Sequence, residues 1–268
     1  MTIIPEKNKL KLNGEQQRRS LSKMDIYKQL SEKGNQIFLF PDEEYPAWNI
    51  IQGVKIKGFQ KTQFAFNTNT VRKLERINKA KLVPGPKKLA QEFFCLNMEQ
   101  ILQKLKGIKE GDKQAFDKLS EEVSIQLRES LSKNVIPERL EVYNLVRKIV
   151  DLTFEHITAM AEELKGYRHI LVPLLNVPLD GWILNSNIIF NKEEKKKLGI
   201  SKGNGNARPG MGCIKNLEKY QEIQAFIYEK AKNISKNGGY TFYPIYFDLL
   251  WNNRYERNGG NLFKTNPK

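Results

Sequence analysis

The sequence predicts a mainly α-helical protein with a small extended element near its N-terminus. From residue 70 onward, apolar side chains recur every three or four positions, which is the spacing that places them on one face of a helix. Residues 53–59 instead alternate apolar and basic side chains, as a half-buried strand or extended loop does. Hydrophobic residues make up 40% of the 268 residues, which is enough for a packed core.

Short elements are expected in the first 50 residues. Residues 1–22 are polar and basic and have little to bury, so we expect a flexible arm. A short helix is predicted over residues 24–30. The apolar run 37–40 ends at Pro41 and indicates a strand or a buried turn. We expect Trp48 in the core.

Long helices are expected in the middle of the chain, over residues 89–105, 113–132 and 138–164. Gly107 ends the first of them. Pro137 suits the first turn of the third helix, because a backbone N–H there would have no partner within the helix. Gly166 is the predicted end of this longest helix.

Shorter elements are expected in the last third of the chain: a charged helix over residues 192–198, a glycine-rich loop over 203–210 and helices over 214–234 and 244–255. The chain is predicted to divide into the arm, an N-terminal helical subdomain over 23–135, a helical subdomain with the candidate catalytic residues over 136–256, and a tail over 257–268.

The net charge of +15, from 45 Lys and Arg against 30 Asp and Glu, favours a polyanionic partner. A general bias toward lysine is the alternative. The 14 Phe, 10 Tyr and 3 Trp favour nucleic acid over an anionic membrane, because bases stack on aromatic rings. No apolar run approaches the roughly 20 residues that cross a bilayer, and the first residues lack a signal-peptide core. We therefore expect a soluble, cytoplasmic protein that does not bind membranes.

Neither a metal nor a cofactor is expected. Cys95, Cys213, His156 and His169 lack the paired short spacings of a zinc site. Asp180 followed by Glu194-Lys195 fits the letters of a magnesium-dependent nuclease motif, but residues 191–199 predict a capped, solvated helix and not the strand that this chemistry needs.

Asp180 follows directly on an apolar segment, in the sequence LLNVPLDGWILN of residues 174–185. An ionised carboxylate beside apolar surface is costly without hydrogen-bond partners. One interpretation is that Asp180 caps a helix that begins at Gly181. The other is that Asp180 is a catalytic acid held at a helix start in a pocket. The two are compatible.

Three motifs together resemble a known family: Arg147-Lys148-Ile149-Val150 on the longest helix, Val177-Pro178-Leu179-Asp180 at a helix start, and Phe247-Asp248-Leu249-Leu250-Trp251 near the end. Over residues 138–255 the chain resembles the DNA glycosylases of the helix-hairpin-helix/GPD superfamily. It looks closest to 8-oxoguanine glycosylase-like folds, which include an archaeal branch with a divergent hairpin and bacterial relatives linked to phage defence.

The resemblance implies roles for particular residues. Asp180 matches the catalytic aspartate, and Lys148 matches the lysine of lyase-competent members. Phe247, Asp248 and Trp251 match the helix that borders the base pocket. The Gly-x-Gly hairpin to which that lysine normally belongs is absent between residues 138 and 164. Two alternatives stay open: Lys148 is a solvated lysine, and Trp251 is a core residue while Asp248 pairs with Arg254.

Chain geometry allows Asp180 to lie beside Lys148. A helix from Lys148 to Gly166 extends about 27 Å at 1.5 Å per residue. The residues from Gly166 to Asp180 can span about 46–50 Å when extended. The chain can therefore return from the end of the helix to Lys148.

The predicted function is that of a DNA N-glycosylase that binds double-stranded DNA as a monomer. It is expected to flip and excise an oxidised purine or a hypermodified phage base, in DNA repair or phage defence. The residues expected to contact phosphate are Arg168, Arg208, Arg254, Lys195 and Lys196. The alternatives are a helical nucleic-acid-binding protein without catalysis and a magnesium-dependent nuclease.

Overall fold

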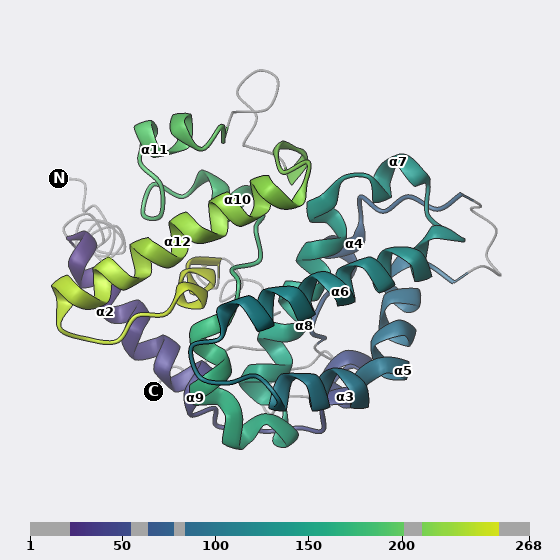
Figure 1. The fold of residues 1–268 in the computed structure, drawn as a ribbon, viewed down its shortest axis with the longest axis horizontal. Helices are drawn as coiled ribbons and strands as arrows, with labels where there is room; N and C mark the ends of the chain where they lie inside the picture. The colour runs from purple at the N-terminus through teal and green to yellow at the C-terminus, as the bar shows by residue number, and fades with distance from the viewer. Residues whose placement is uncertain (1–21, 55–63, 78–83, 201–210, 252–268) are drawn as a thin grey trace, which may run out of the picture.

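The computed structural model describes residues 22–54, 64–77, 84–200 and 211–251. Within these ranges the protein is mainly α-helical, which confirms the predicted fold class (Figure 1). Extended backbone pairing in this part of the chain takes the form of isolated bridges, Tyr45 with Ala161 and Arg76 with Val135. Most of the extended element predicted over residues 53–59 lies outside the described residues.

The elements of the first half are α2 (Lys23–Gly34), η2 (Asn35–Leu39), α3 (Ala47–Gln52), α4 (Thr68–Val71), α5 (Pro86–Lys106) and α6 (Lys113–Ser132). Those of the second half are α7 (Pro137–Leu140), α8 (Tyr143–Met160), η3 (Glu162–Tyr167), α9 (Arg168–Leu171), η4 (Val172–Leu174), α10 (Gly181–Asn185), α11 (Lys192–Lys197), η5 (Met211–Cys213), α12 (Leu217–Gly238) and η6 (Pro244–Trp251). The helices predicted over 89–105, 113–132, 192–198 and 214–234 correspond to α5, α6, α11 and α12.

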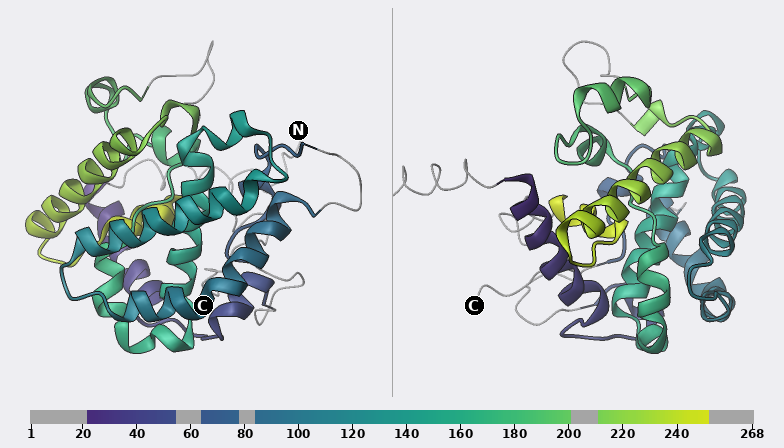
Figure 2. Two further views of the ribbon diagram at one scale, coloured as in Figure 1. Left: turned by 45° about the vertical axis from the view of Figure 1, so that its right-hand side comes forward. Right: turned by 60° about the vertical axis from the view of Figure 1, so that its left-hand side comes forward.

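Helix α8 is the central element of the fold. All of its residues are buried except Lys148 and Leu152. Helix α6 packs along α8, and α3, α4, η2 and η3 contact it as well (Figure 2). A helix covered on every side is normally apolar all round. Buried polar residues of α8 therefore need partners from other elements.

The beginning and the end of the described chain pack together. Helix α2 contacts η6. In Figure 1 the purple α2 and the yellow η6 both lie in the left half of the view. The Tyr246 hydroxyl donates a hydrogen bond to Asn35 Oδ1 over 2.6 Å. The contact is close enough to require a glycine, because a Cβ atom on Gly34 would lie 2.5 Å from the Tyr246 ring.

The prediction of one helix over residues 138–164 is wrong, because the chain leaves the helical path twice. Val142, with φ −75° and ψ 94°, separates α7 from α8, and Ala161 is extended after Met160. At the second break Tyr45 supplies the missing partners: its N–H donates to the Met160 carbonyl, and its carbonyl accepts from Glu162 N–H. A distant segment thus replaces the helical hydrogen bonds at this point.

Three smaller predictions also need correction. Residues 37–40 belong to neither a strand nor a simple turn, because η2 continues α2 as a π-helical segment. The last predicted helix, over residues 244–255, is a 3₁₀ segment as far as Trp251. Trp48 is 51% exposed and does not lie in the core. No helix in the described part of the chain is long and apolar enough to cross a membrane.

The predicted subdomain boundary at residue 135 falls in the turn between α6 and α7, and α6 packs against α8 across it. The arm over residues 1–22, apart from Ser22, and the tail over 257–268 lie outside the described residues.

Candidate functional site

Lys148 and Asp180 form an ion pair at the centre of the candidate site. Lys148 Nζ lies 3.0 Å from Asp180 Oδ2. The side chains are only 13% and 7% exposed, respectively. The two residues that the resemblance singled out are thus neighbours, as chain geometry allowed, and Lys148 is not a solvated lysine.

Asp180 also caps helix α10, so both interpretations of its position describe one residue. Its Oδ1 accepts hydrogen bonds from the backbone N–H groups of Trp182, over 2.8 Å, and Ile183, over 3.0 Å. The backbone of Asp180 is extended, with φ −133° and ψ 179°, as in a typical N-cap. One carboxylate oxygen therefore stabilises the helix start, and the other faces Lys148.

The extended segment before Asp180 is held by side-chain amides from two helices. Asn144 of α8 donates from Nδ2 to the Leu179 carbonyl over 2.7 Å. Gln224 of α12 bonds both backbone groups of Val177: its Nε2 donates to the carbonyl over 2.7 Å, and its Oε1 accepts from the N–H over 3.2 Å. These bonds fix the path by which the chain delivers Asp180 to Lys148.

Two further carboxyl groups, those of Glu155 and Asp248, lie buried beside this pair. Burial raises the pKa of Asp248, and the Asp180 charge raises it further. Burial likewise raises the pKa of Glu155, and the neighbouring Asp248 carboxyl raises it further. Ionised carboxylates cannot bond to each other, and both Glu155 carboxyl oxygens are buried without a hydrogen-bond partner among the described residues. Burial and the proximity of the two carboxyls therefore favour a proton on this pair.

Sequence reasoning missed Glu155. The available signal was its spacing: Glu155 follows Lys148 by seven residues and so lies on the same face of α8, two turns further on. It is also an acid in a largely apolar run, and it is completely buried. A buried acid on the helix face of the candidate lysine is a reason to include it in the site.

The four side chains suit a reaction in which positive charge develops. With one proton shared between Glu155 and Asp248, the site carries one positive charge and two negative charges. The surplus negative charge lies where little water can screen it. The site also combines an amine, a carboxylate and a held proton within one buried region, which is a set that can perform nucleophilic and acid–base chemistry.

The other residues predicted to border the base pocket are Phe247 and Trp251. Phe247 is fully buried, and its ring packs edge-on against Phe242 and Tyr27, with centroid distances of 4.9 and 6.2 Å. This environment is an aromatic core cluster. Trp251 ends η6, but its side chain lies outside the described residues, as does all of Arg254.

The placement of Arg168 does not fit the prediction that it contacts phosphate. Its side chain is buried, and Nη1 lies 2.6 Å from Glu44 Oε1. Nε and Nη2 donate to the carbonyls of Thr158 and Ala161, each over 3.2 Å. Arg168 therefore binds the carbonyls at the end of α8, where a cation is favourable.

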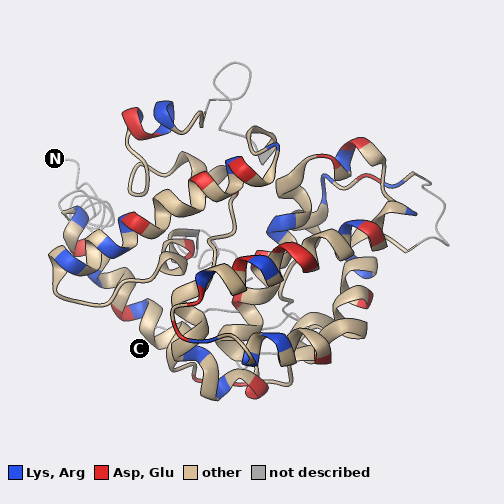
Figure 3. Ribbon diagram, in the orientation of Figure 1, with Lys and Arg blue, Asp and Glu red and all other residues tan. Residues whose placement is uncertain are grey.

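Lys195 and Lys196 lie at the basic end of the short helix α11, which has acidic residues at its start (Figure 3). Lys195 Nζ donates to the Asn185 carbonyl over 2.6 Å and to Asn187 Oδ1 over 2.9 Å, so it connects α11 to the end of α10. Lys196 is exposed. Arg208 lies outside the described residues. Phosphate contact by either lysine stays a prediction.

Among the described residues, no group of three or more His, Cys, Asp and Glu side chains is arranged to hold a metal ion. His156 is buried on α8, and burial lowers its pKa to about 4. Its Nδ1 lies 2.6 Å from the Leu152 carbonyl. His156 is therefore a neutral, internally bonded histidine at neutral pH.

Comparison of the chain with protein-family models, with curated proteins and with solved structures gave no match. What can be inferred about function therefore starts from the Lys148–Asp180 pair and the two carboxyls beside it.

Proposed function

We propose that the protein is a DNA N-glycosylase that excises a damaged or modified base. The observation that supports this most is the 3.0 Å contact between Lys148 Nζ and Asp180 Oδ2 in a largely buried site. An amine and a carboxylate in contact are the groups that this reaction needs next to C1′ of a flipped nucleotide. The same two residues carry the resemblance to DNA glycosylases.

In the proposed reaction the nucleotide is flipped out of the duplex, at a cost of a few kcal/mol. Asp180 takes a proton from the Lys148 ammonium, and the neutral amine attacks C1′. As the nitrogen bonds to C1′, the bond from C1′ to the base breaks, and the base leaves with the electron pair. Opening of the sugar ring at C1′ then gives a Schiff base with Lys148. Without attack by Lys148, Asp180 would instead activate water, and an abasic site would remain.

The buried carboxyl pair supports both parts of this step. The leaving base needs a proton, and the Glu155–Asp248 contact holds one beside the ion pair. The sugar gains positive charge in the transition state, and the surplus negative charge of the site favours that charge. Groups fixed in advance around a developing charge are typically worth about 3–4 kcal/mol when one of them is removed.

Two candidate substrates follow from the resemblance: an oxidised purine, or a hypermodified pyrimidine of phage DNA. The corresponding role is DNA repair or phage defence. A panel of duplexes with single modified bases, together with phage DNAs, distinguishes them when released bases are identified by mass spectrometry.

The first prediction tests Asp180 itself. Asp180→Asn keeps the oxygen that caps α10 but removes the charge that faces Lys148. We expect it to reduce base release by about 100-fold or more, since about 3 kcal/mol corresponds to that factor. Its matched control is Asp112→Asn, because Asp112 caps α6 in the same way, over 2.9 Å to Ala115 N–H, on the exposed surface. The control variant should release base at the normal rate.

Lysine attack and water attack are separated by borohydride trapping. Reduction of a Schiff base links DNA covalently to the wild-type protein, and Lys148→Gln should abolish the linkage. Normal base release by Asp180→Asn would contradict the proposal and leave Asp180 as a helix cap. Strand cutting that stops in EDTA, without base release, would indicate the nuclease instead. DNA binding without either product would indicate a non-catalytic binding protein.

A further inference from the structure

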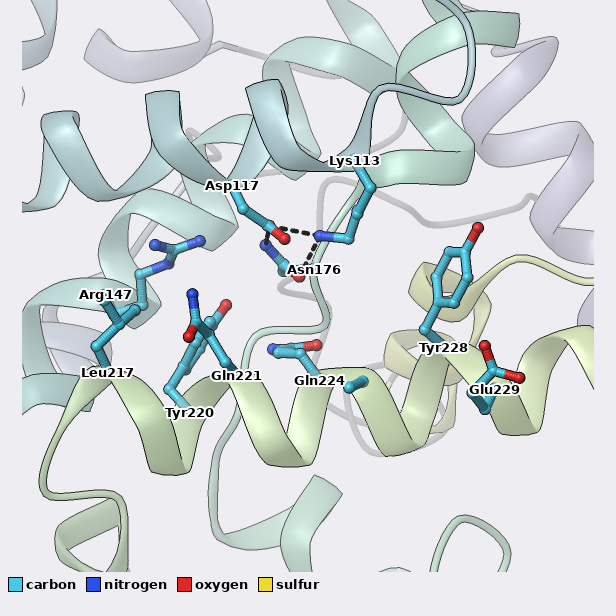
Figure 4. Close-up of a pocket in the computed structure, with 11 residues that line it drawn as sticks. Lys113, Asp117, Arg147, Asn176, Leu217, Tyr220, Gln221, Gln224, Tyr228 and Glu229 are labelled. Atoms are coloured by element: carbon cyan, nitrogen blue, oxygen red, sulfur yellow. Dashed lines mark hydrogen bonds and ion pairs between the residues drawn. The ribbon is translucent and has the colours of Figure 1, made fainter.

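A cavity lies between α6, α8 and α12, and Asn176 of the segment that leads to Asp180 also lines it (Figure 4). Its volume is about 270 Å³. Tyr220, Gln224 and Tyr228 line it from one face of α12, since they are four residues apart. None of the four residues of the candidate catalytic site lines this cavity. It is therefore a separate site.

The floor of the cavity contains a buried arginine with an unused donor. Arg147 is 1% exposed, and its Nε donates to Asp151 Oδ1 over 2.9 Å. Its Nη1 donates to Glu121 Oε2 over 3.3 Å. Nη2 is buried and has no acceptor among the described residues. A buried donor without an acceptor costs about 1–3 kcal/mol, so an acceptor oxygen in the cavity would be favourable.

The surrounding charges favour a neutral acceptor over an anion. The guanidinium of Arg147 already contacts the carboxylates of Asp151 and Glu121. The second cation, Lys113, has Nζ 2.5 Å from Asp117 Oδ1 and 2.8 Å from Asn176 Oδ1, as the dashed lines of Figure 4 show. Glu229 adds another carboxylate at the edge. A phosphate would meet more negative than positive charge here, whereas a carbonyl oxygen would not be repelled.

The remaining wall suits a flat ring with hydrogen-bond donors. The exposed side chain of Tyr228 supplies aromatic surface, and the carboxylates of Asp117 and Glu229 can accept from ring N–H or amino groups. The volume is just below the roughly 300 Å³ at which pockets for drug-sized ligands begin. One small ring system fits within this volume.

Solvent can reach the cavity between α6 and α12. Gln221, Tyr228 and Glu229 at the edge are exposed, while Tyr220 and Gln224 at the floor are buried. We propose that this cavity binds a small neutral heterocycle with keto and N–H groups, of the free-nucleobase type. The keto oxygen accepts from Arg147 Nη2, and the ring lies against Tyr228. This proposal does not depend on glycosylase activity.

The probe for the test is 5-bromouracil, because its bromine can be located by anomalous scattering in crystals of the full chain. We expect the bromine in the cavity, and binding in solution measured by calorimetry. Tyr228→Ala should weaken that binding about tenfold or more through loss of stacking. Phe40→Ala is the control, because Phe40 is an aromatic residue that is 74% exposed and does not line the cavity.

Further measurements distinguish this cavity from the candidate catalytic site. Asp180→Asn should leave 5-bromouracil affinity unchanged even if it abolishes base release. Bromine density beside Lys148, or affinity that falls with Asp180→Asn, would overturn the proposal. Inorganic phosphate that binds in the cavity as tightly as the probe would make it an anion site. An ordered water on Arg147 Nη2 with no probe bound would show that the cavity needs no ligand.

Discussion

Glu155 and Asp248 behave differently from exposed acids because each is buried against another carboxyl. Their pKa values are raised in the folded protein. In the unfolded chain both ionise near pH 4. Around neutral pH the folded state therefore holds more protons than the unfolded state. This contribution to stability is fully present below the unfolded pKa and is lost as the pH rises through the folded pKa.

The second prediction concerns this pH dependence. Glu155→Gln replaces the shared proton by an amide N–H, which can donate to Asp248 at any pH. The wild-type free energy of unfolding should fall with rising pH near neutrality, by up to about 1.4 kcal/mol per pH unit for one proton. The variant should show a flatter profile. Urea unfolding at several pH values between 5.5 and 8.5 measures both.

Asp151, whose pKa burial raises to about 6, also raises the pKa of Glu155, so part of the difference between the two profiles reflects this interaction. Glu129→Gln on the exposed face of α6 is the control and should follow the wild-type profile. Parallel profiles for wild type and Glu155→Gln would mean that Glu155 and Asp248 share no proton.

At the residue scale the sequence predicted Lys148 and Asp180 but not Glu155. The first two belong to short motifs that can be recognised without a fold. The role of Glu155 depends on Asp248, which is 93 residues further along the chain and reaches it only through the packing of η6. The prediction for Arg168 failed for a related reason, because its partner Glu44 lies 124 residues away.

At the element scale, the segment from Leu175 to Asp180 is held through its backbone as well as through the side chains of Asn176 and Asp180. It belongs to no helix, so its carbonyl and N–H groups need partners from elsewhere. The side-chain amide of Asn144 on α8 supplies one such partner by donating to the Leu179 carbonyl. Asn144 lies four residues before Lys148 on the same face of α8. Lys148 and the support of Asp180 are thus parts of one rigid element.

The third prediction tests that support. Asn144→Ala leaves the buried Leu179 carbonyl without its partner, which should lower the free energy of unfolding by about 1–3 kcal/mol. Base release should fall about tenfold or more, because displacements of about 1 Å at a reacting group have effects of that size or larger. Unfolding curves and single-turnover rates measure the two effects.

Asn97→Ala is the matched control, because Asn97 makes the same kind of bond on α5, from Nδ2 to the Phe93 carbonyl over 2.8 Å. It should leave the single-turnover rate unchanged. A normal single-turnover rate for Asn144→Ala, measured under conditions in which the variant is fully folded, would mean that Asp180 is positioned without Asn144.

Helices α5, α6, α11 and α12 could be predicted because hydrophobic spacing and capping residues are local signals. The ends of α8 could not. Residues 138–164 have the pattern of one helix, yet Tyr45 pairs with Ala161 and ends α8 at Met160. This interruption depends on Tyr45, which lies 116 residues before Ala161. The helical spacing of apolar residues contains no information about so distant a partner.

At the scale of the whole molecule, the positive charge is unevenly distributed along the chain. Of the 45 Lys and Arg and the 30 Asp and Glu, the described residues hold 29 and 27. The two signs are interspersed along the helices in Figure 3. The other five segments therefore hold 16 basic and 3 acidic residues, which is most of the net charge of +15.

The fourth prediction follows from this distribution. Substitution by Gln of the five basic residues in residues 1–21 (Lys7, Lys9, Lys11, Arg18 and Arg19) should weaken DNA binding and its dependence on salt. For every side chain that no longer neutralises a phosphate, the slope of log affinity against log salt concentration should become shallower by about 0.9. Binding titrations at several salt concentrations measure the slope.

The control removes the same charge from exposed positions on α5, α6 and the turns after them: Lys88, Lys104, Lys109, Lys118 and Lys133 to Gln. A smaller change in slope is expected there. Equal changes in the two variants would mean that total charge, rather than its position in the chain, determines DNA affinity.

The packing of α2 against η6 has a consequence for the synthesis of the protein on the ribosome. Translation proceeds at about 5–20 residues per second, so Asp248 leaves the ribosome on the order of seconds after Asp180. Until then α2 lacks the element that covers it, and Glu155 lacks the carboxyl that shares its proton. A nascent chain that already contains Lys148 and Asp180 is therefore still incomplete at the candidate site. The proposed glycosylase activity would therefore begin only after η6 has been made and has packed against α2.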